Sequence, residues 1–193
     1  MTQFLACWML LGSFSLVDLI DSEANAEHAL WTEYRLHFDL AGYSERHHIE
    51  PFTWRGLRVI SQRFDPLKPA RGVVHIVHGY LDHTGIQEPL IKAITENGFT
   101  VRTIDLPGHG VSQGARAQIK SMLHYSEVLG LWLKGQTRPL RIIGHSMGGK
   151  SAMLLSCLHP SYVNKLAVLD IAPVKYTHSQ LDKVLALLNV DLS

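Results

Sequence analysis

The chain has 193 residues, of which 46% are apolar and 18% charged. This composition suits one globular domain with a sizeable core and excludes a disordered chain. The net charge is +1 and no basic cluster occurs, so nothing indicates nucleic acid as a partner. Two cysteines make no disulfide framework, and the twelve histidines show no metal-binding spacing. The sequence therefore implies neither a metal nor a cofactor.

The N-terminal part divides into an apolar segment, residues 1–26, and an extension, residues 27–52. Residues 4–17 are nearly all apolar and uncharged, and residues 24–26 (ANA) have the small-x-small form of a signal-peptidase site. No Lys or Arg precedes Arg35, however, and the apolar run is shorter than the about 20 residues that span a membrane. A cleaved signal, a membrane-surface segment and an amphipathic helix packed on the domain all remain open. A cytoplasmic location is favoured over export.

From residue 53 to residue 193 the chain alternates between strand and helix patterns, which predicts a single α/β domain. Strand patterns cover 57–64, 73–77, 99–104, 140–143 and 166–172, and helical patterns begin near Pro89 and cover 118–133, 150–158 and 177–190. Residues 57–64 alternate polar and apolar, as in an edge strand, whereas 73–77 form an apolar run typical of a buried parallel strand. Repeated β–α units imply right-handed crossovers and a mostly parallel sheet with helices on both faces.

Histidine and cysteine often take part in catalysis or metal binding, but we expect no such role for His47, His48 or Cys157. His47 and His48 lie in a polar stretch, so we expect them at the surface. Cys157 falls in the helical pattern 150–158, and we expect a buried small apolar residue there rather than a reactive thiol.

Three glycine-rich turns follow strand patterns, after Val77, Ile104 and Ile143. In a parallel sheet of this kind, ligands bind at the carboxyl ends of the strands. All three turns belong to that end, so the sequence predicts one site built from three separated segments.

The third turn, residues 144–149 (GHSMGG), has the strand–turn–helix context of a nucleophile elbow. Such a turn holds Ser146 in a strained backbone conformation, so its close neighbours must be small, as Gly144 and Gly148 are. Gly149 lets the following helix lie close to the sheet. The hydroxyl of Ser146 then projects at a helix N-terminus, where the backbone N–H of Met147 can receive a developing oxyanion.

At these residues the chain resembles the α/β-hydrolase family, over about 53–193. The turn that begins at His78-Gly79 has the H-G-x-x-x-H form of the oxyanion loop in monoacylglycerol lipases and lysophospholipases. The resemblance implies that the backbone N–H of Tyr80 is the second oxyanion donor. It also implies structural roles for Asp105 and His109 in the second turn.

The region from the elbow onward, with residues 170–174 (DIAPV) behind it, is more similar to a group of small bacterial and mitochondrial acyl esterases. The two halves therefore resemble different branches of the family. The natural substrate stays open between lipids and other esters.

The family order Ser, then Asp or Glu, then His requires two catalytic residues after Ser146. Beyond Ala172 the chain offers His178 as a histidine, in the segment that begins the family's lid. That position would need an unrelated geometry, so we expect the acid and base, the last strands and most of the lid to be missing. The strand at 166–172 would then form a bare edge through which the chain self-associates.

These patterns favour a serine hydrolase of carboxylic esters, of the esterase, lipase or lysophospholipase type, that acts on a small ester or a lipid through an acyl-enzyme. Because the base is missing, we expect these 193 residues to have little activity on their own. The alternative is a truncated, non-catalytic hydrolase-fold protein that binds a ligand or a partner. A membrane surface is also a candidate partner, through residues 4–17.

Overall fold

The computed structural model describes residues 29–116, 121–138 and 140–174. The apolar segment 1–26 and the helix expected over 177–190 lie outside the described residues.

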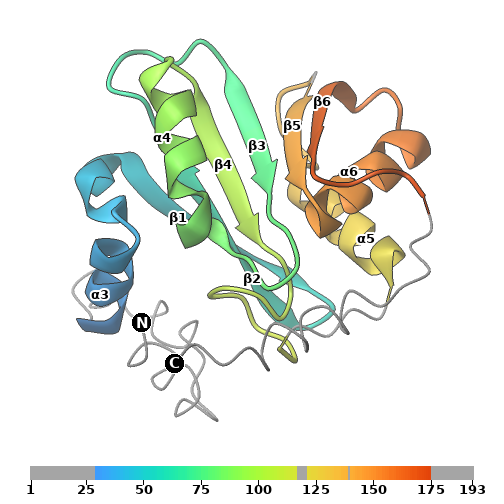
Figure 1. Ribbon diagram of the computed structural model, residues 1–193, viewed down its shortest axis with the longest axis horizontal. Helices are drawn as coiled ribbons and strands as arrows, with labels where there is room; N and C mark the ends of the chain where they lie inside the picture. The colour runs from blue at the N-terminus through green and yellow to red at the C-terminus, as the bar shows by residue number, and fades with distance from the viewer. Residues whose placement is uncertain (1–28, 117–120, 139, 175–193) are drawn as a thin grey trace, which may run out of the picture.

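In the described part of the chain, a six-stranded sheet has the order β1-β2-β4-β3-β5-β6 (Figure 1). The strands are β1 (His47–Trp54), β2 (Leu57–Phe64), β3 (Val73–Val77), β4 (Thr100–Asp105), β5 (Leu140–His145) and β6 (Val163–Leu169). The helices are α3 (Ala29–His37), α4 (Glu88–Glu96), α5 (Met122–Trp132) and α6 (Met147–Leu158), with the 3₁₀ helices η2 (Leu40–Arg46) and η3 (Thr84–Gln87).

The sheet is parallel from β4 through β3 and β5 to β6, whereas β2 pairs antiparallel with both β1 and β4. Each parallel neighbour is reached through a crossover, and helices cover both faces of the sheet (Figure 1). The predicted fold class, a mostly parallel α/β sheet with helices on both sides, is confirmed.

The edge strand on the antiparallel side is β1, which lies mainly in the stretch 27–52 that we expected as an extension. The prediction that 57–64 forms the edge was therefore wrong, because β2 pairs on both sides. Pro51 is exposed in β1, as suits an edge strand that has one unpaired side. His47 is half-buried rather than exposed: its ring stacks on Phe64 at 4.2 Å between centroids, and burial lowers its pKa to about 4.

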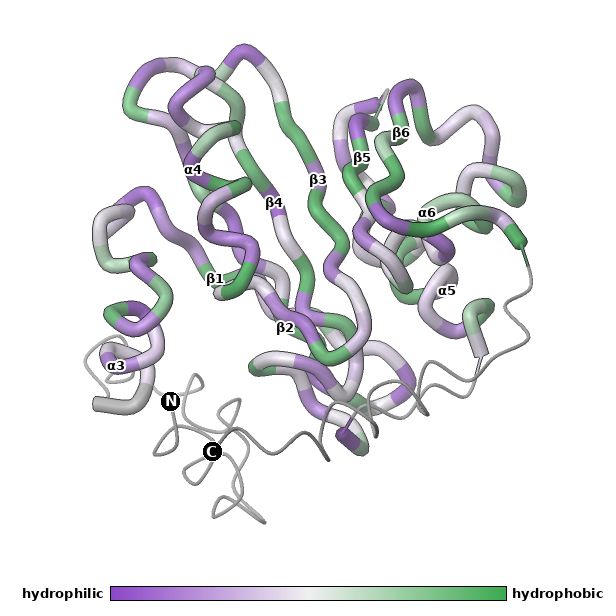
Figure 2. Tube along the Cα trace, in the orientation of Figure 1, coloured by the Kyte–Doolittle hydropathy of each residue, from purple (hydrophilic) through white to green (hydrophobic). Residues whose placement is uncertain are grey.

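Two clusters of buried apolar side chains lie on opposite faces of the sheet. Neighbouring residues of a strand point to opposite faces, so Val59 joins one cluster and Ile60 the other. Helices α5 and α6 cover the first face, where Leu129 and Leu155 are buried. Helices α3, η2 and α4 cover the second face, where Tyr34 is buried. The central strand β3 is mostly hydrophobic along its trace (Figure 2), as expected for a strand covered on both sides.

The helix boundaries follow local signals. Helix α4 has a proline in its first turn, and the chain leaves it through Gly98, which has a φ of +82°. Helix α5 begins at Met122, where the side chain of Ser121 caps it by accepting the N–H of Leu123 at 3.1 Å. Residues 118–120 of the predicted helix lie outside the described residues. Cys157 is exposed near the end of α6, so the prediction of a buried cysteine was wrong.

The last described strand starts three residues earlier than the predicted 166–172 and ends at Leu169. Among the described residues β6 pairs with β5 alone, and the side chain of Leu169 is 43% exposed. Self-association through this edge stays a prediction that sedimentation would test. None of the described helices is both long and apolar enough to cross a membrane.

Candidate active site

Three loops meet at the carboxyl end of the parallel strands, as the sequence predicts. The pairs Val77 with Ile104 and Val77 with Gly144 place the ends of β3, β4 and β5 side by side. The loops that follow these strands therefore share one edge of the sheet.

Ser146 occupies the turn between β5 and α6. Its φ of 47° and ψ of −114° lie outside the regions that L-residues favour, at a cost of about 1–3 kcal/mol. Two backbone hydrogen bonds hold this conformation: the Ser146 N–H donates to Leu169 O at 2.9 Å, and the Lys150 N–H donates to Ser146 O at 3.0 Å. The residue is the N-cap of α6, so its hydroxyl lies at the positive end of that helix.

The glycines around Ser146 are required by close backbone approaches. A Cβ on Gly144 would lie 2.7 Å from Gly149 Cα, and a Cβ on Gly149 would lie 2.9 Å from Gly144 O. A Cβ on Gly148 would lie 2.5 Å from the carbonyl oxygen of Val77. Each distance is too short for any side chain, so the three glycines allow α6 to start directly against β5 and β3.

The loop after β3, residues 78–85, lies against the elbow. His78 Nε2 accepts the N–H of Leu106 at 2.9 Å, so the ring proton is on Nδ1 and donates to Gly79 O at 2.6 Å. A Cβ on Gly79 would lie 3.4 Å from Ser146 Cβ. His78 therefore joins the β3 and β4 loops, and Gly79 brings the backbone of Tyr80 beside the serine.

Within the described residues, neither the N–H of Tyr80 nor that of Met147 donates a hydrogen bond to another group of the protein. The Tyr80 side chain is 40% exposed, whereas the Met147 side chain is buried among the α5 and α6 residues. These two N–H groups are the candidate oxyanion donors.

The loop after β4 is held by a buried carboxylate. Asp105 accepts hydrogen bonds from the Thr84 N–H at 2.8 Å, the Thr84 hydroxyl at 2.7 Å and the Val111 N–H at 3.0 Å. His109 Nδ1 lies 3.1 Å from Pro107 O, and burial, assisted by His78, lowers the pKa of His109 to about 4.

The structure brings no base to Ser146 among the residues that it describes. No described histidine forms a hydrogen bond with Ser146 Oγ, and His178 lies outside the described residues. Sequence reasoning missed one pair near the serine: His145 Nδ1 lies 3.7 Å from Asp82 Oδ2. Asp82 sits inside the recognised loop motif, but the sequence carried no signal of its partner.

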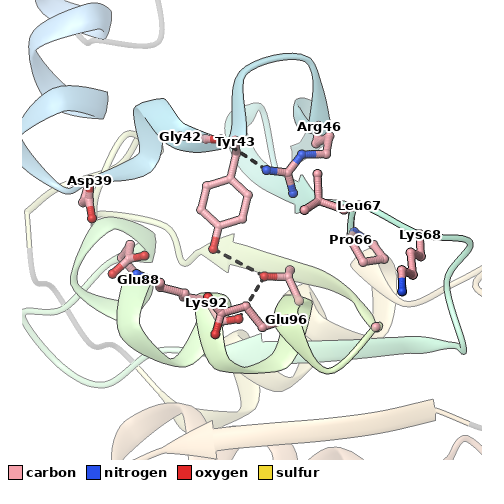
Figure 3. A pocket seen from close by; sticks show the side chains of 12 residues that line it. Asp39, Gly42, Tyr43, Arg46, Pro66, Leu67, Lys68, Glu88, Lys92 and Glu96 are labelled. Atoms are coloured by element: carbon pink, nitrogen blue, oxygen red, sulfur yellow. Dashed lines mark hydrogen bonds between the residues drawn. The ribbon is translucent and has the colours of Figure 1, made fainter.

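A cavity of about 420 Å³ lies beside α4 and η2 and not at the elbow (Figure 3). Its lining includes three acidic and three basic side chains: Asp39, Glu88, Glu96, Arg46, Lys68 and Lys92. Tyr43 crosses it, with its hydroxyl 3.5 Å from Thr95 Oγ1. None of the predicted site residues lines this cavity. Over the described ranges, no group of three His, Cys, Asp or Glu side chains is placed to hold a metal.

A smaller hollow, of about 250 Å³, lies at the same end of the sheet as Ser146. Trp54, Pro107 and Tyr125 contribute to its lining. The ring of His109 lies between Tyr125 and Tyr80, with centroid distances of 6.2 and 6.0 Å. This chain of rings connects the hollow with the loop beside the serine.

Large parts of the chain are similar to known proteins. Residues 68–190, well over half of the chain, match the protein family described as serine aminopeptidase, S33. Over 110 residues the chain is 29% identical to a monoacylglycerol lipase of Mycolicibacterium smegmatis. The aligned region covers 54% of this chain and 39% of that protein. Over 105 residues the chain is 36% identical to the phospholipase YtpA of Bacillus subtilis. This aligned region covers 53% of this chain and 36% of that protein.

Solved structures extend the likeness of the fold. A thermostable carboxyl esterase from Bacillus coagulans superposes with a TM-score of 0.57 at 22% identity, over 74% of this chain and 49% of the esterase. The matched part spans about two fifths or less of the two curated relatives and half of the solved esterase.

Proposed function

The chain belongs to the serine aminopeptidase S33 family of α/β hydrolases, and we propose that it is a carboxylic ester hydrolase with Ser146 as its nucleophile. The observation that carries the proposal is the backbone of Ser146, held at a φ of 47° where β5 meets α6. A strained serine at this point in an α/β sheet is the arrangement that exposes a nucleophile. Relatives named as lipases and esterases favour ester over other substrates.

The proposed reaction has two steps. A base removes the proton of Ser146 Oγ, the oxygen attacks the ester carbonyl carbon, and the alcohol leaves with a proton as the acyl-enzyme forms. Water then attacks the acyl-enzyme and releases the carboxylic acid. In both steps the N–H groups of Tyr80 and Met147 would stabilise the oxyanion. Removing one such donor from a hydrolase typically costs about 10²–10³ in rate.

We propose a small ester or a lipid as substrate. The 250 Å³ hollow beside the β4 loop offers the rings of Trp54 and Tyr125 to an apolar acyl or alcohol group. Tyr80 and Leu81 present further apolar surface beside the elbow, where they are 40% and 57% exposed. Relatives named as a monoacylglycerol lipase and a phospholipase act on substrates of this chemistry.

The rate expected of these 193 residues alone is low. No described histidine forms a hydrogen bond with Ser146 Oγ, and a serine hydrolase without its base loses on the order of 10⁴–10⁶ in rate. The alternative is therefore a protein that only binds a ligand or a partner, and an experiment must distinguish it from an enzyme.

The test is labelling of the purified chain with a fluorophosphonate probe, followed by mass spectrometry of the labelled peptide. We expect slow labelling confined to Ser146, which Ser146→Ala abolishes. The matched control is Ser161→Ala, an exposed serine beyond α6 that should leave the rate unchanged. A folded wild-type chain without any label at Ser146 would contradict the nucleophile assignment and favour the binding protein.

A further inference from the structure

The carboxylate of Asp82 collects several donors from the loop that carries Tyr80. It accepts the N–H of His83 at 2.7 Å on Oδ1 and the N–H of Gly79 at 3.4 Å on Oδ2, and it also accepts the side-chain amide of Gln87. The residue is 9% exposed. Asp82 therefore fixes both sides of its own turn and ties the turn to the start of α4.

This turn contains a strained residue. Leu81 has a φ of +59°, a left-handed conformation that a branched apolar residue rarely adopts. Its side chain is 57% exposed, so burial does not offset the strain. Hydrogen bonds from Gly79 and His83 to Asp82 span Leu81 from both sides and account for its conformation.

His145, the residue before the serine, completes the contact between the turn and the elbow. A Cβ on Gly79 would lie 2.7 Å from His145 Nδ1, so the imidazole rests directly on the backbone of Gly79. Nδ1 is buried and forms no hydrogen bond within the described residues, and it lies 3.7 Å from Asp82 Oδ2.

We infer that Asp82 and His145 form a latch that holds the Tyr80 N–H in position beside Ser146. The inference rests on the proposed function, because an oxyanion donor matters only for a reacting serine. Both are positioning residues: neither needs to touch a substrate. Asp82 holds the turn through its hydrogen bonds with Gly79 and His83. His145, one residue before the nucleophile, contacts Gly79 and so fixes the turn relative to the elbow.

Asp105 is a second buried carboxylate in the same region, and its contacts are purely structural. It binds Thr84 and Val111, which lie beyond the turn, and it is fully buried away from the elbow contacts. Asp82 differs because its Oδ2 accepts from Gly79 and Gln87 and also lies 3.7 Å from His145 Nδ1, at the elbow.

The experiment uses the full chain with Asp82→Asn, His145→Gln and the double variant. The side-chain amide introduced by Asp82→Asn has one acceptor oxygen in place of two and no charge. Matched controls are Asp39→Asn and His159→Gln, which are exposed and remote from the elbow. Two readouts are measured: hydrogen exchange of the Gly79 and His83 amides, which donate to Asp82, and the saturation kinetics of fluorophosphonate labelling at Ser146.

We expect each latch variant to speed exchange of the Gly79 and His83 amides, which donate to Asp82, about tenfold, the scale of one weakened charge-assisted hydrogen bond. The double variant should be no faster than the faster single variant, because both substitutions break one unit. Labelling should lose about tenfold in its maximal rate with an unchanged half-saturating probe concentration, since the oxyanion donor acts after binding.

Two results overturn the latch: exchange in the latch variants that matches the controls, or single effects that multiply in the double variant. The exchange readout needs no reactive serine. Coupled exchange in a chain that is never labelled would therefore reject the proposed function while keeping the latch, and normal labelling without coupled exchange would reject the latch alone.

Discussion

Replacing Gly148 by alanine should destabilise the protein, although alanine is the better helix former. Both Gly148, in α6, and Gly130, in α5, lie inside helices, where alanine is favoured over glycine by about 0.8–1.0 kcal/mol. The two positions differ in the space for a methyl group. At Gly130 the nearest atom is Leu155 Cδ1 at 3.7 Å, an ordinary contact, whereas at Gly148 the nearest atoms include the backbone oxygen of Val77 at 2.5 Å.

The steric cost at Gly148 follows from that distance. Real Cβ contacts essentially never fall below 3.0 Å, so the backbone of β3 must move away by at least about half an ångström. Overpacking of this kind costs about 1–3 kcal/mol, and the upper end applies because backbone cannot rotate aside. After the gain in helix propensity, Gly148→Ala should lose about 2 kcal/mol, and Gly130→Ala should gain up to about 1 kcal/mol.

Thermal and urea unfolding of both variants measures this contrast. For a chain of this length 1 kcal/mol corresponds to about 2–4 °C, so Tm should fall by about 4–8 °C for Gly148→Ala and rise by about 2–4 °C for Gly130→Ala. Equal or higher stability of Gly148→Ala would refute the reasoning that close approach to β3, rather than flexibility, requires this glycine.

Three further changes have expected outcomes. His75 is 2% exposed, and burial lowers its pKa to about 4. Because the unfolded chain takes up the proton at a higher pH than the folded chain, the free energy of unfolding should fall by up to about 3 kcal/mol as pH drops from 6.5 to 4. The stability of His75→Phe should depend less on pH over this range. Trp132→Phe removes the donor that binds Ser61 Oγ at 2.7 Å and should cost about 1–3 kcal/mol in urea unfolding, whereas Trp132→Phe with Ser61→Ala should recover part of it. Asp105→Asn should cost about 2–4 kcal/mol, because its carboxylate accepts three buried hydrogen bonds; an unchanged Tm would contradict this role.

The parallel half of the fold could be predicted because its signals are local. The apolar run of β3, the glycine stop after α4 and the elbow motif each occupy a few consecutive residues. Strand β1 was missed because its sequence, HHIEPFTW, contains two histidines and Pro51 and has no clear alternation. Ile49, Phe52 and Trp54 pack on the two cores, and the ring of His47 adds a stack on Phe64 that only the tertiary structure reveals.

The order of strands could not be read from the sequence either. The alternating pattern of β2 predicts one wet face, but β1 and β4 pair with its two edges and a helical layer covers each face. At the site, the motif located Ser146 and its glycines within a few residues, because steric demands act on neighbours. The contact of Asp82 with His145 links residues 63 positions apart, and no local pattern encodes it.

The two apolar clusters on either side of the sheet become complete at different points during synthesis of the chain. Every buried member of the cluster under α3 and α4 lies between Trp31 and Val111. The other cluster needs Leu155, in α6. Because ribosomes release the chain from its N-terminus at about 5–20 residues per second, the first core has all its side chains several seconds before the elbow is synthesised. The newly made segment 29–111 can therefore bury one face of its sheet first, and Ser146 enters its strained turn on a scaffold that is already half built.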